Sequence, residues 1–295
     1  MSHRSGLVAL AGRPNVGKST LANALAGRHV AAVSPRPQTS RRRISAVVHG
    51  EDWQAVLLDL PGFQRSVDQL TARMQATVDQ TLADADAALF VVNAAEPSGP
   101  GDRFIAERLR AAGRPAIAVV NQVDRVDPGR IAEAIAAAAA VLGDDLIALH
   151  PVSALTGDGL DALRADLPRL LGEGPAFFPP GVATDQTEEE LAAELIREAA
   201  LARLRQELPH ALAVDVQEID PAKTGGLVVR AGLVVETESQ KGIVVGRGGS
   251  MVRDIGAAAR ATLARAWGTE VHLDLTVRVR RHWREDPAML TRLGL

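Results

Sequence analysis

The sequence contains no cysteine among its 295 residues, and only 3% of the residues are aromatic. Without thiols the chain has no cysteine-ligated zinc site, no iron–sulfur cluster and no cysteine nucleophile. The absence also fits a reducing compartment. No stretch reaches the roughly 18–20 uninterrupted apolar residues of a membrane-spanning helix. The short apolar run Leu7–Ala11 leads directly into a glycine-rich loop, so no leader peptide is expected.

The net charge is small, but the charged residues are unevenly distributed along the chain. The net charge is −3, and the length suggests about two domains. Residues 187–240 carry five Lys/Arg and eleven Asp/Glu, whereas residues 241–295 carry ten Lys/Arg and five Asp/Glu. The basic C-terminal segment indicates a face that binds a polyanion. An unevenly charged, solvated surface explains the same counts equally well.

The first part of the chain alternates short apolar runs with amphipathic segments. The apolar runs are typical of buried parallel strands, and the alternation predicts an α/β domain whose mostly parallel sheet is covered by helices on both faces. The expected strands are Leu7–Ala11, Ile44–His49, Trp53–Leu58, Ala87–Val92, Pro115–Val120 and Leu146–Leu149. The expected helices are Lys18–Ala26, Val67–Leu82, Asp102–Ala112, Arg130–Leu142 and Asp161–Leu170.

A segment rich in proline and glycine separates this domain from a second one. Thr187 and Glu190 form a capping box at the start of a helix that is expected to reach about Glu207. Two β-rich runs, a glycine cluster, a helix and a final strand follow, which predicts an α+β domain. The expected division is a first domain over residues 1–171, a linker over 172–186, a second domain over 187–281 and a tail over 282–295.

The sequence after the first strand matches the phosphate-loop pattern GxxxxGK[ST]. Its residues are Gly12, Arg13, Pro14, Asn15, Val16, Gly17, Lys18 and Ser19, followed by Thr20. Glycines allow backbone N–H groups to converge on phosphate oxygens, and the helix that begins beside the loop adds the positive end of its dipole. Lys18 is expected to bind the β- and γ-phosphates and Ser19 to bind Mg²⁺. A simple glycine turn is the alternative, which the strand before and the helix after disfavour.

Two later loops indicate that the nucleotide is a guanine nucleotide. Asn121, Gln122 and Asp124 follow an apolar strand and resemble the NKxD motif of GTPases, with Gln122 in place of the lysine. The carboxylate of Asp124 can accept hydrogen bonds from N1–H and the 2-amino group of guanine, and adenine offers neither donor. Asn121 is expected to tie this loop to the phosphate loop. The next strand is followed by a sequence that resembles the SAx loop of GTPases, formed by Ser153, Ala154 and Leu155.

Two further segments are expected to sense the γ-phosphate. Asp59, Leu60, Pro61 and Gly62 match DxxG at the end of a strand. Asp59 would hold Mg²⁺ through water, and the N–H of Gly62 would bond the γ-phosphate. In the long loop His29–Arg43 a hydroxyl of either Thr39 or Ser40 would complete the Mg²⁺ shell. Both segments would relax when the γ-phosphate leaves.

The glycine cluster of the second domain fits the GxxG loop of KH domains, which clamps a nucleic-acid backbone. The candidate RNA-binding residues are Lys241, Gly246, Arg247, Gly248, Gly249, Arg253, Arg281 and Trp283. Trp283 would either stack on a base or anchor the tail to the core, and the sequence leaves both readings open.

Taken together, the motifs GRPNVGKSTL, PQTSR, DLPG, NQVD and SAL, followed by GIVVGRGG, resemble the Era family among the TrmE-Era-EngA-like P-loop GTPases over nearly the whole chain. The resemblance implies a GTPase domain followed by a type II KH domain. It implies binding of GTP and GDP, binding of the 3′ region of 16S rRNA and assistance to 30S ribosomal subunit assembly. It further implies a cytoplasmic, monomeric protein with a fraction loosely bound to the inner face of the cytoplasmic membrane.

Some positions bear on how well the nucleotide is held and hydrolysed. Gln122 has a shorter stem than the family's lysine and no charge, so guanine preference should persist with somewhat weaker affinity. Phe63 cannot orient the attacking water as a glutamine does in Ras-like proteins, and Gln64 is the neighbouring alternative. We therefore expect slow hydrolysis. In relatives with Asn in the phosphate loop a potassium ion can partly replace an arginine finger, and Asn15 matches that position, so the resemblance implies stimulation by potassium. The expected catalytic residues are Lys18, Ser19, Thr39, Ser40, Asp59 and Gly62.

Three other functions compete with this reading. One is a P-loop ATPase or kinase, against which Asp124 argues. Another is an RNA chaperone in which GTP is only a structural ligand, which magnesium-dependent turnover would exclude. The third is a GTPase whose C-terminal domain binds protein, which an RNA interaction weakened by salt would disfavour.

Overall fold

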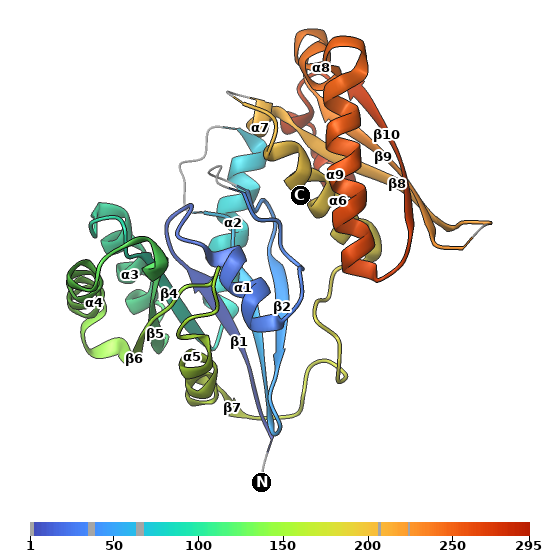
Figure 1. The fold of residues 1–295 in the computed structure, drawn as a ribbon. Coiled ribbons are helices and arrows are strands. Elements are labelled where there is room, and N and C mark those ends of the chain that lie inside the picture. The colour runs from blue at the N-terminus through green and yellow to red at the C-terminus, as the bar shows by residue number, and fades with distance from the viewer. Residues whose placement is uncertain (1–2, 35–38, 63–67, 206–207, 224) are drawn as a thin grey trace. The chain divides into compact units, whose positions relative to one another are not determined.

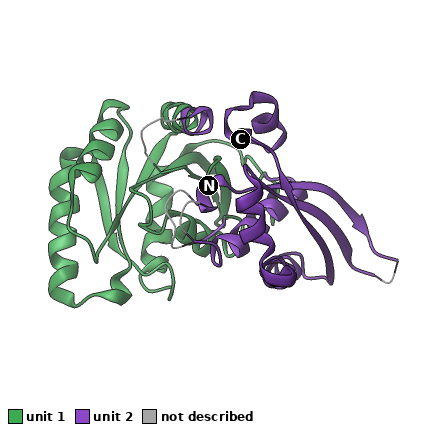
Figure 2. Cartoon of the chain, turned by 90° about the horizontal axis from the view of Figure 1, so that it is seen from above, with its two compact units in different colours: residues 1–31, 40–64, 75–185 green, residues 32–39, 65–74, 186–295 purple. Residues whose placement is uncertain are grey.

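The computed structural model describes residues 3–34, 39–62, 68–205, 208–223 and 225–295 (Figure 1). The chain forms two compact units, which Figure 2 colours separately. Unit 1 comprises residues 1–31, 40–64 and 75–185, and unit 2 comprises residues 32–39, 65–74 and 186–295. Unit 2 therefore includes two short segments from the first half of the chain. Within the described residues no helix has the length and apolar content to cross a membrane.

The sheet of unit 1 has the order β2-β3-β1-β4-β5-β6, with β7 beside β1. Its strands are β1 (Arg4–Ala11), β2 (Ile44–His49), β3 (Trp53–Asp59), β4 (Ala87–Asn93), β5 (Ala116–Asn121), β6 (Leu146–Pro151) and β7 (Gly172–Glu173). The pairs β2–β3 and β1–β7 are antiparallel, and the other pairs are parallel. The ends of β1, β3, β5 and β6 therefore lie at one edge of the sheet, which is where ligands bind in such folds.

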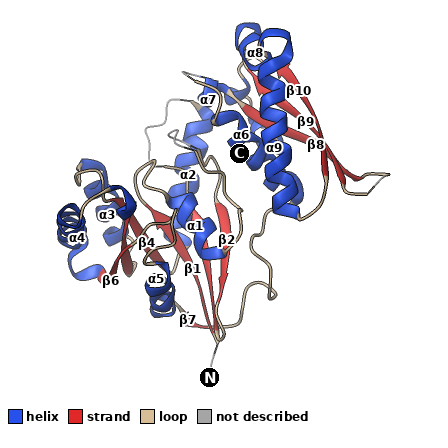
Figure 3. Ribbon diagram, in the orientation of Figure 1, coloured by secondary structure: helices blue, strands red, loops and turns tan. Residues whose placement is uncertain are grey.

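Helices cover both faces of this sheet (Figure 3). They are α1 (Lys18–Ala26), α2 (Gln69–Asp84), α3 (Pro100–Ala111), α4 (Pro128–Leu142) and α5 (Leu160–Asp166). Alternate residues of β1 point to opposite faces: Val8 and Leu10 share a core with α1 and α5, whereas Ala9 and Ala11 share one with α2, α3 and α4. The predicted α/β class is confirmed.

The segment expected as a free linker is bonded along the strands of unit 1. After β7, the carbonyl of Ala183 accepts a hydrogen bond from the backbone N–H of Val47 at 2.8 Å, and Gln54 Nε2 donates to the carbonyl of Phe178 at 2.9 Å. Ser45 Oγ donates to Asp185 at 2.8 Å. Proline lacks an N–H, but the segment keeps its carbonyls, and groups of β2 and β3 use them. Residues 172–185 of the expected linker are therefore hydrogen-bonded to unit 1.

Unit 2 contains a three-stranded sheet in the order β10-β9-β8. Its strands are β8 (Ala213–Pro221), β9 (Leu227–Val235) and β10 (Val271–Val279), and its helices are α6 (Glu188–Leu201), α7 (Leu208–Ala211), α8 (Glu238–Val245), α9 (Ser250–Trp267) and α10 (Pro287–Arg292). Strands β8 and β9 are antiparallel, and β9 and β10 are parallel. Leu195 and Ile255 of the helices share a core with Val229 and Leu233 of β9. This is the expected α+β domain.

Helix α8 was missing from the sequence expectation, which had only an apolar turn before the glycine cluster. Thr237 caps this helix by accepting a hydrogen bond from the backbone N–H of Gln240 at 3.2 Å, and Gln240 bonds back to the Thr237 N–H. This capping box is the same signal that was read correctly at Thr187. Helix α6, in turn, ends at Leu201 and not near Glu207.

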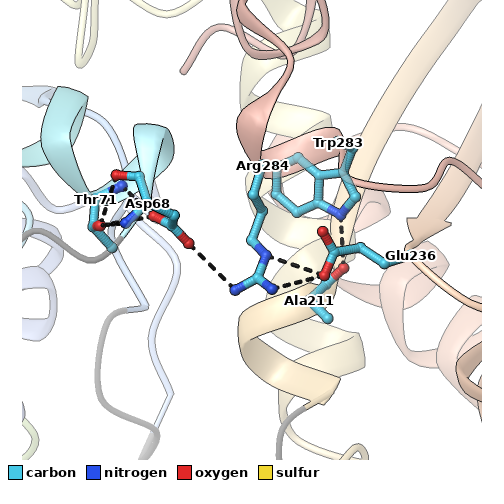
Figure 4. Close-up of polar contacts among 6 residues, drawn as sticks. All are labelled: Asp68, Thr71, Ala211, Glu236, Trp283 and Arg284. Atoms are coloured by element: carbon cyan, nitrogen blue, oxygen red, sulfur yellow. Dashed lines mark hydrogen bonds and ion pairs between the residues drawn. The ribbon is translucent and has the colours of Figure 1, made fainter.

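The expected tail is part of the core of unit 2. The indole of Trp283 is 1% exposed, and its Nε1 donates to the carbonyl of Ala211 at 2.9 Å (Figure 4). It packs with Leu70 and Met74 from the start of α2 and with Leu290 of α10. An indole buried in this way has no free face for a base. The prediction that Trp283 binds RNA is therefore wrong, and the alternative, an anchor, describes it.

Candidate functional site

The phosphate loop connects β1 to α1 and has the close backbone approaches that its glycines permit. A Cβ at Gly12 would lie 2.4 Å from the carbonyl oxygen of Val91. Gly17 adopts a φ of +94°, in the left-handed region that favours glycine. Lys18 Nζ donates to the carbonyls of Gly12 and Arg13 at 3.0 and 3.1 Å. The ammonium therefore lies inside the curve of the loop.

The charge of Lys18 is held in a desolvated position. Burial lowers the pKa of Lys18 below its ordinary value, and the nearby carboxylate of Asp59 raises that pKa in part. A buried cation with few charged neighbours favours an anionic ligand, because the ligand replaces the lost water. This is the electrostatic condition for binding phosphates.

Arg13 links the phosphate loop to two acidic side chains. Its Nε donates to Asp102 at 2.8 Å, and its Nη1 lies 3.2 Å from Glu96. The Asp102 side chain is 1% exposed and also accepts a hydrogen bond from the backbone N–H of Gly99 at 2.9 Å. No sequence pattern predicts this pair, since 89 residues separate Arg13 from Asp102.

Three oxygen-bearing side chains meet beside Lys18. Ser19 Oγ donates to Asp59 Oδ2 at 2.5 Å, and Ser40 Oγ lies 3.1 Å from both that carboxylate oxygen and Ser19 Oγ. Hydroxyl and carboxylate oxygens are the kind of ligand that Mg²⁺ prefers. The residues present therefore fit this ion, and they bring Ser40 into the set that the sequence left open between Thr39 and Ser40.

The DxxG segment lies against the phosphate loop. A Cβ at Gly62 would lie 2.8 Å from Cγ of Pro14, so glycine is required for this approach. Leu60 is buried in the core under α2 and α3, and Pro61 is also buried. The predictions for Phe63 and Gln64 fall outside the described residues, as do those for residues 35–38.

Asn121 joins three loops through one buried side chain. Its Nδ2 donates to the carbonyl of Val16 in the phosphate loop at 2.9 Å, and its Oδ1 accepts from the backbone N–H of Ala154 at 3.0 Å. Both ends of the amide are used inside the protein. The expectation that Asn121 ties its own loop to the phosphate loop matches this geometry, and the contact with Ala154 extends it to the SAx loop.

Asp124 and Ser153 lie together at the open side of these loops. Ser153 Oγ donates to Asp124 Oδ1 at 2.6 Å, which orients the carboxylate. Asp124 is exposed, and the side chain of Leu155 is 79% exposed beside the same loop. The carboxylate is therefore fixed in direction and accessible, as base reading requires. The sequence did not reveal a further neighbour, Arg125, whose Nη1 donates to Gln122 Oε1 at 2.7 Å.

The glycine cluster of unit 2 lies between α8 and α9. Gly246, Gly248 and Gly249 have φ values of +73°, +59° and +78°, which non-glycine residues rarely adopt. Arg253 Nη1 donates to the carbonyl of Gly248 at 2.8 Å and supports the turn, while Arg247 is exposed. Lys241 lies 3.8 Å from Glu238. The basic side chains therefore surround an exposed backbone turn.

Comparison with known proteins identifies both units. Residues 7–122 match the family model described as "50S ribosome-binding GTPase", and residues 207–284 match the KH domain model. The chain is 46% identical over 295 residues to the GTPase Era of Mycolicibacterium paratuberculosis, covering 99% of this chain and 98% of that protein. The chain belongs to the Era GTPase family. It is also 45% identical to the GTPase Era of Mycobacterium tuberculosis over 98% of both chains.

Solved structures of Era agree with this membership. The chain resembles an Era variant of Aquifex aeolicus bound to GDP·AlF4⁻, with a TM-score of 0.92 and 34% identity over 99% of both chains. It resembles equally an Era complex with MgGDPNP and nucleotides 1506–1542 of 16S ribosomal RNA, again with a TM-score of 0.92. The fold predicted from the sequence, a P-loop GTPase domain followed by a KH domain, is confirmed, and the protein is a GTPase.

The close approach between Gly17 and Asn121 yields a test of the site. A Cβ at Gly17 would lie 2.3 Å from Asn121 Nδ2, whereas one at Gly27, which also has a positive φ of +65°, meets nothing within 4 Å. Both alanine substitutions incur the backbone strain, about 1–2 kcal/mol, but only Gly17→Ala displaces Asn121. We expect titration with a fluorescent GDP analogue to give at least roughly tenfold weaker binding for Gly17→Ala, as one lost hydrogen-bonded contact of 1.4 kcal/mol would give, and native binding for Gly27→Ala. Equal affinities in the two variants would contradict the role of Asn121.

Proposed function

We propose that this protein is a GTP-hydrolysing switch that binds the 3′ region of 16S rRNA and assists assembly of the 30S ribosomal subunit. The observation that carries the proposal is the likeness of the whole chain to the Era complex with MgGDPNP and 16S ribosomal RNA. The described site residues supply the chemistry. We further propose that the protein works as a monomer in the cytoplasm, with a fraction on the inner membrane surface.

In the proposed site each loop has a separate task. Residues 12–20 hold the phosphates, with Lys18 at the β- and γ-phosphates. Asp124 reads the guanine N1–H and 2-amino donors. A backbone N–H near Ala154 meets the guanine carbonyl oxygen, while the N–H of Ala154 itself bonds Asn121. Buried donors and acceptors discriminate strongly against a base that leaves them unpaired, so Asp124 argues against an ATPase or a kinase. Residues 59–62 face the γ-phosphate.

Mg²⁺ would be held by Ser19 and Ser40, and by Asp59 through water; when bound it neutralises charge that develops on the phosphates. Lys18 shares that task from inside the phosphate loop. The backbone N–H of Gly62 orients the γ-phosphate, and its approach to Pro14 keeps it at the phosphate loop. These contributions are electrostatic and positional, and slow hydrolysis follows because the described residues include no arginine assigned to the transferred phosphate.

The RNA-binding part of the proposal depends on the glycine cluster at residues 246–249. Glycine adopts the positive φ values of this turn readily and has no side chain that would block the approach of a phosphate to the backbone. Arg247, Arg253 and Arg281 are exposed and add positive charge, which attracts phosphates. Lys241 contributes from the middle of α8, where its distance to Glu238 is 3.8 Å.

Coupling between nucleotide and RNA is supported by a network within unit 2. Asp68, six residues after Gly62, accepts a hydrogen bond from the backbone N–H of Thr71 at 2.8 Å and so caps the start of α2. Arg284 Nη1 lies 3.4 Å from Asp68 Oδ2, and Arg284 Nη2 lies 2.7 Å from Glu236 (Figure 4). Glu236 directly precedes the cap of α8, which leads to the glycine cluster.

The charge of Arg284 is well suited to hold these two carboxylates. Its hydrogen bond to Glu236 raises the pKa of Arg284, burial lowers it, and the charges of Glu236, Asp68 and Glu285 raise it again. The guanidinium therefore stays charged under all conditions in which the protein functions. We infer that a displacement of Asp68 reaches the RNA-binding loop through Arg284 and Glu236.

The potassium proposal is tested by turnover in KCl and NaCl at equal ionic strength. We expect turnover in potassium to be higher by roughly tenfold, because an arginine finger contributes about 10³–10⁵ and the ion replaces only part of it. In Asn15→Ala the difference should disappear while basal hydrolysis in sodium persists. Equal rates in both salts would remove potassium from the proposal.

RNA binding is tested with a single-stranded RNA copied from the 3′ end of 16S rRNA, with a non-hydrolysable GTP analogue and then with GDP. Gly249→Asp should weaken binding by at least roughly tenfold, because it places a negative charge at the phosphate path. The matched control is Gly268→Asp at the other end of α9, where φ is also positive and the space is open. Native-like binding by both variants, or no binding by the native protein, would contradict the RNA role.

The coupling is tested by the ratio of RNA affinities measured with the GTP analogue and with GDP. Arg284→Gln removes the charge that holds Asp68 and Glu236, so we expect this ratio to fall toward one. Arg292→Gln breaks a comparable ion pair in unit 2, with Asp215 at 2.9 Å, and should leave the ratio unchanged. An altered RNA affinity with an unaltered ratio in Arg284→Gln would show a direct RNA contact and would contradict coupling through Arg284.

A further inference from the structure

The residue that departs most from the family's base-reading motif has both ends of its side chain engaged. Gln122 takes the place of a lysine, and its backbone adopts a φ of +66°. Its Nε2 donates to the carbonyl of Asn15 in the phosphate loop at 3.0 Å. Its Oε1 accepts from Arg125 Nη1 at 2.7 Å. The amide orientation therefore follows from its partners, since one end meets an acceptor and the other a donor.

A lysine at this position could make only the first of these contacts. An ammonium group has three donors and no acceptor, so it could donate to the carbonyl of Asn15 but could not accept from Arg125. It would also bring a second positive charge next to the guanidinium. Glutamine in place of lysine thus removes one positive charge and, at the same time, supplies the acceptor for the hydrogen bond from Arg125.

We propose that Gln122 and Arg125 together perform the task of the single lysine in the family's motif. Gln122 holds the phosphate loop through Asn15, and Arg125 supplies the positive charge that attracts and retains the anionic nucleotide. The inference rests on the proposed nucleotide site, because it assigns a further residue to that site. Arg125 is thereby a nucleotide-binding residue of this chain, and it lies next to Asp124 in the turn Val123–Arg125.

The local backbone keeps the pair together. The N–H of Arg125 donates to the carbonyl of Gln122 at 3.2 Å, so the two residues are joined by a backbone and a side-chain hydrogen bond. Arg125 is exposed and Gln122 is half-buried. The guanidinium is therefore fixed at one nitrogen and open to solvent elsewhere, so that its remaining donors are accessible to a ligand.

The experiment measures the dissociation constant of a fluorescent GDP analogue for the native protein and for a double-mutant cycle. The variants are Arg125→Ala, Arg125→Lys, Gln122→Lys and the double variant Gln122→Lys with Arg125→Ala. Arg130→Ala is the matched control, because it removes a charge nearby from an arginine that pairs with Glu133 at 2.7 Å. Each affinity is measured at two salt concentrations.

We expect Arg125→Ala to weaken GDP binding about threefold to tenfold, the range for a charge-assisted contact at an exposed site. The loss should shrink as salt rises, because salt screens the charge. Arg125→Lys should recover most of the affinity. In the double variant, compared with Gln122→Lys alone, the affinity for GDP should be unchanged or higher. Arg130→Ala should bind GDP with the affinity of the native protein.

Two outcomes would overturn the proposal. One is native affinity in Arg125→Ala, and the other is an equal loss on removing Arg125 whether position 122 carries Gln or Lys. The variant Asp124→Asn distinguishes a failure of this proposal from a failure of the proposed nucleotide site. If Asp124 reads guanine, that variant loses GDP affinity and gains affinity for xanthosine diphosphate, whose C2 carbonyl accepts from the new amide. Unchanged GDP binding in Asp124→Asn would reject the site itself, whatever Arg125 does.

Discussion

The geometry of the nucleotide site depends on a single buried amide. Asn121 is 2% exposed, and its two polar ends bond the phosphate loop and the SAx loop. These loops follow β1 and β6, while Asn121 ends β5, so one side chain fixes the ends of three strands. A buried amide that lost one partner would pay the desolvation of the group left behind, about 1–3 kcal/mol. This requirement holds the loops in one mutual arrangement before any ligand arrives.

Two opposite charges are buried in the same site. Lys18 is desolvated, and Asp59 is buried with two serine hydroxyls against its carboxylate. An isolated charge in such a position is unfavourable, and the two charges offset each other only in part. A phosphate group beside Lys18 and a cation beside Asp59 would satisfy both. The electrostatics of the site therefore favour a phosphate ligand together with a metal ion, a conclusion independent of any likeness to relatives.

What the sequence could predict follows from how far apart the interacting residues lie. The phosphate loop, the DxxG segment and the strand–helix alternation are local patterns, and the structure has them in the expected elements. The bond from Trp283 to Ala211 spans 72 residues, and the contact from Arg284 to Asp68 spans 216. No local sequence pattern predicts contacts between residues so far apart in the chain. A linker and a tail were therefore expected at segments that are hydrogen-bonded in the structure. Helix α8 is different, because its capping box at Thr237 was legible and was overlooked.

Helix α2 contains residues of both units. Its 16 residues make a rod of roughly 24 Å at 1.5 Å per residue. Residues 69–74 belong to unit 2 and residues 75–84 to unit 1. Asp68 at its start is bonded to Arg284, while Leu70 and Met74 share a core with Trp283. A helix transmits displacement along its axis better than a loop does, because each residue is bonded to the next turn. The contacts of Asp68, Leu70 and Met74 therefore hold the start of α2 in the core of unit 2, and the proposed coupling depends on these contacts.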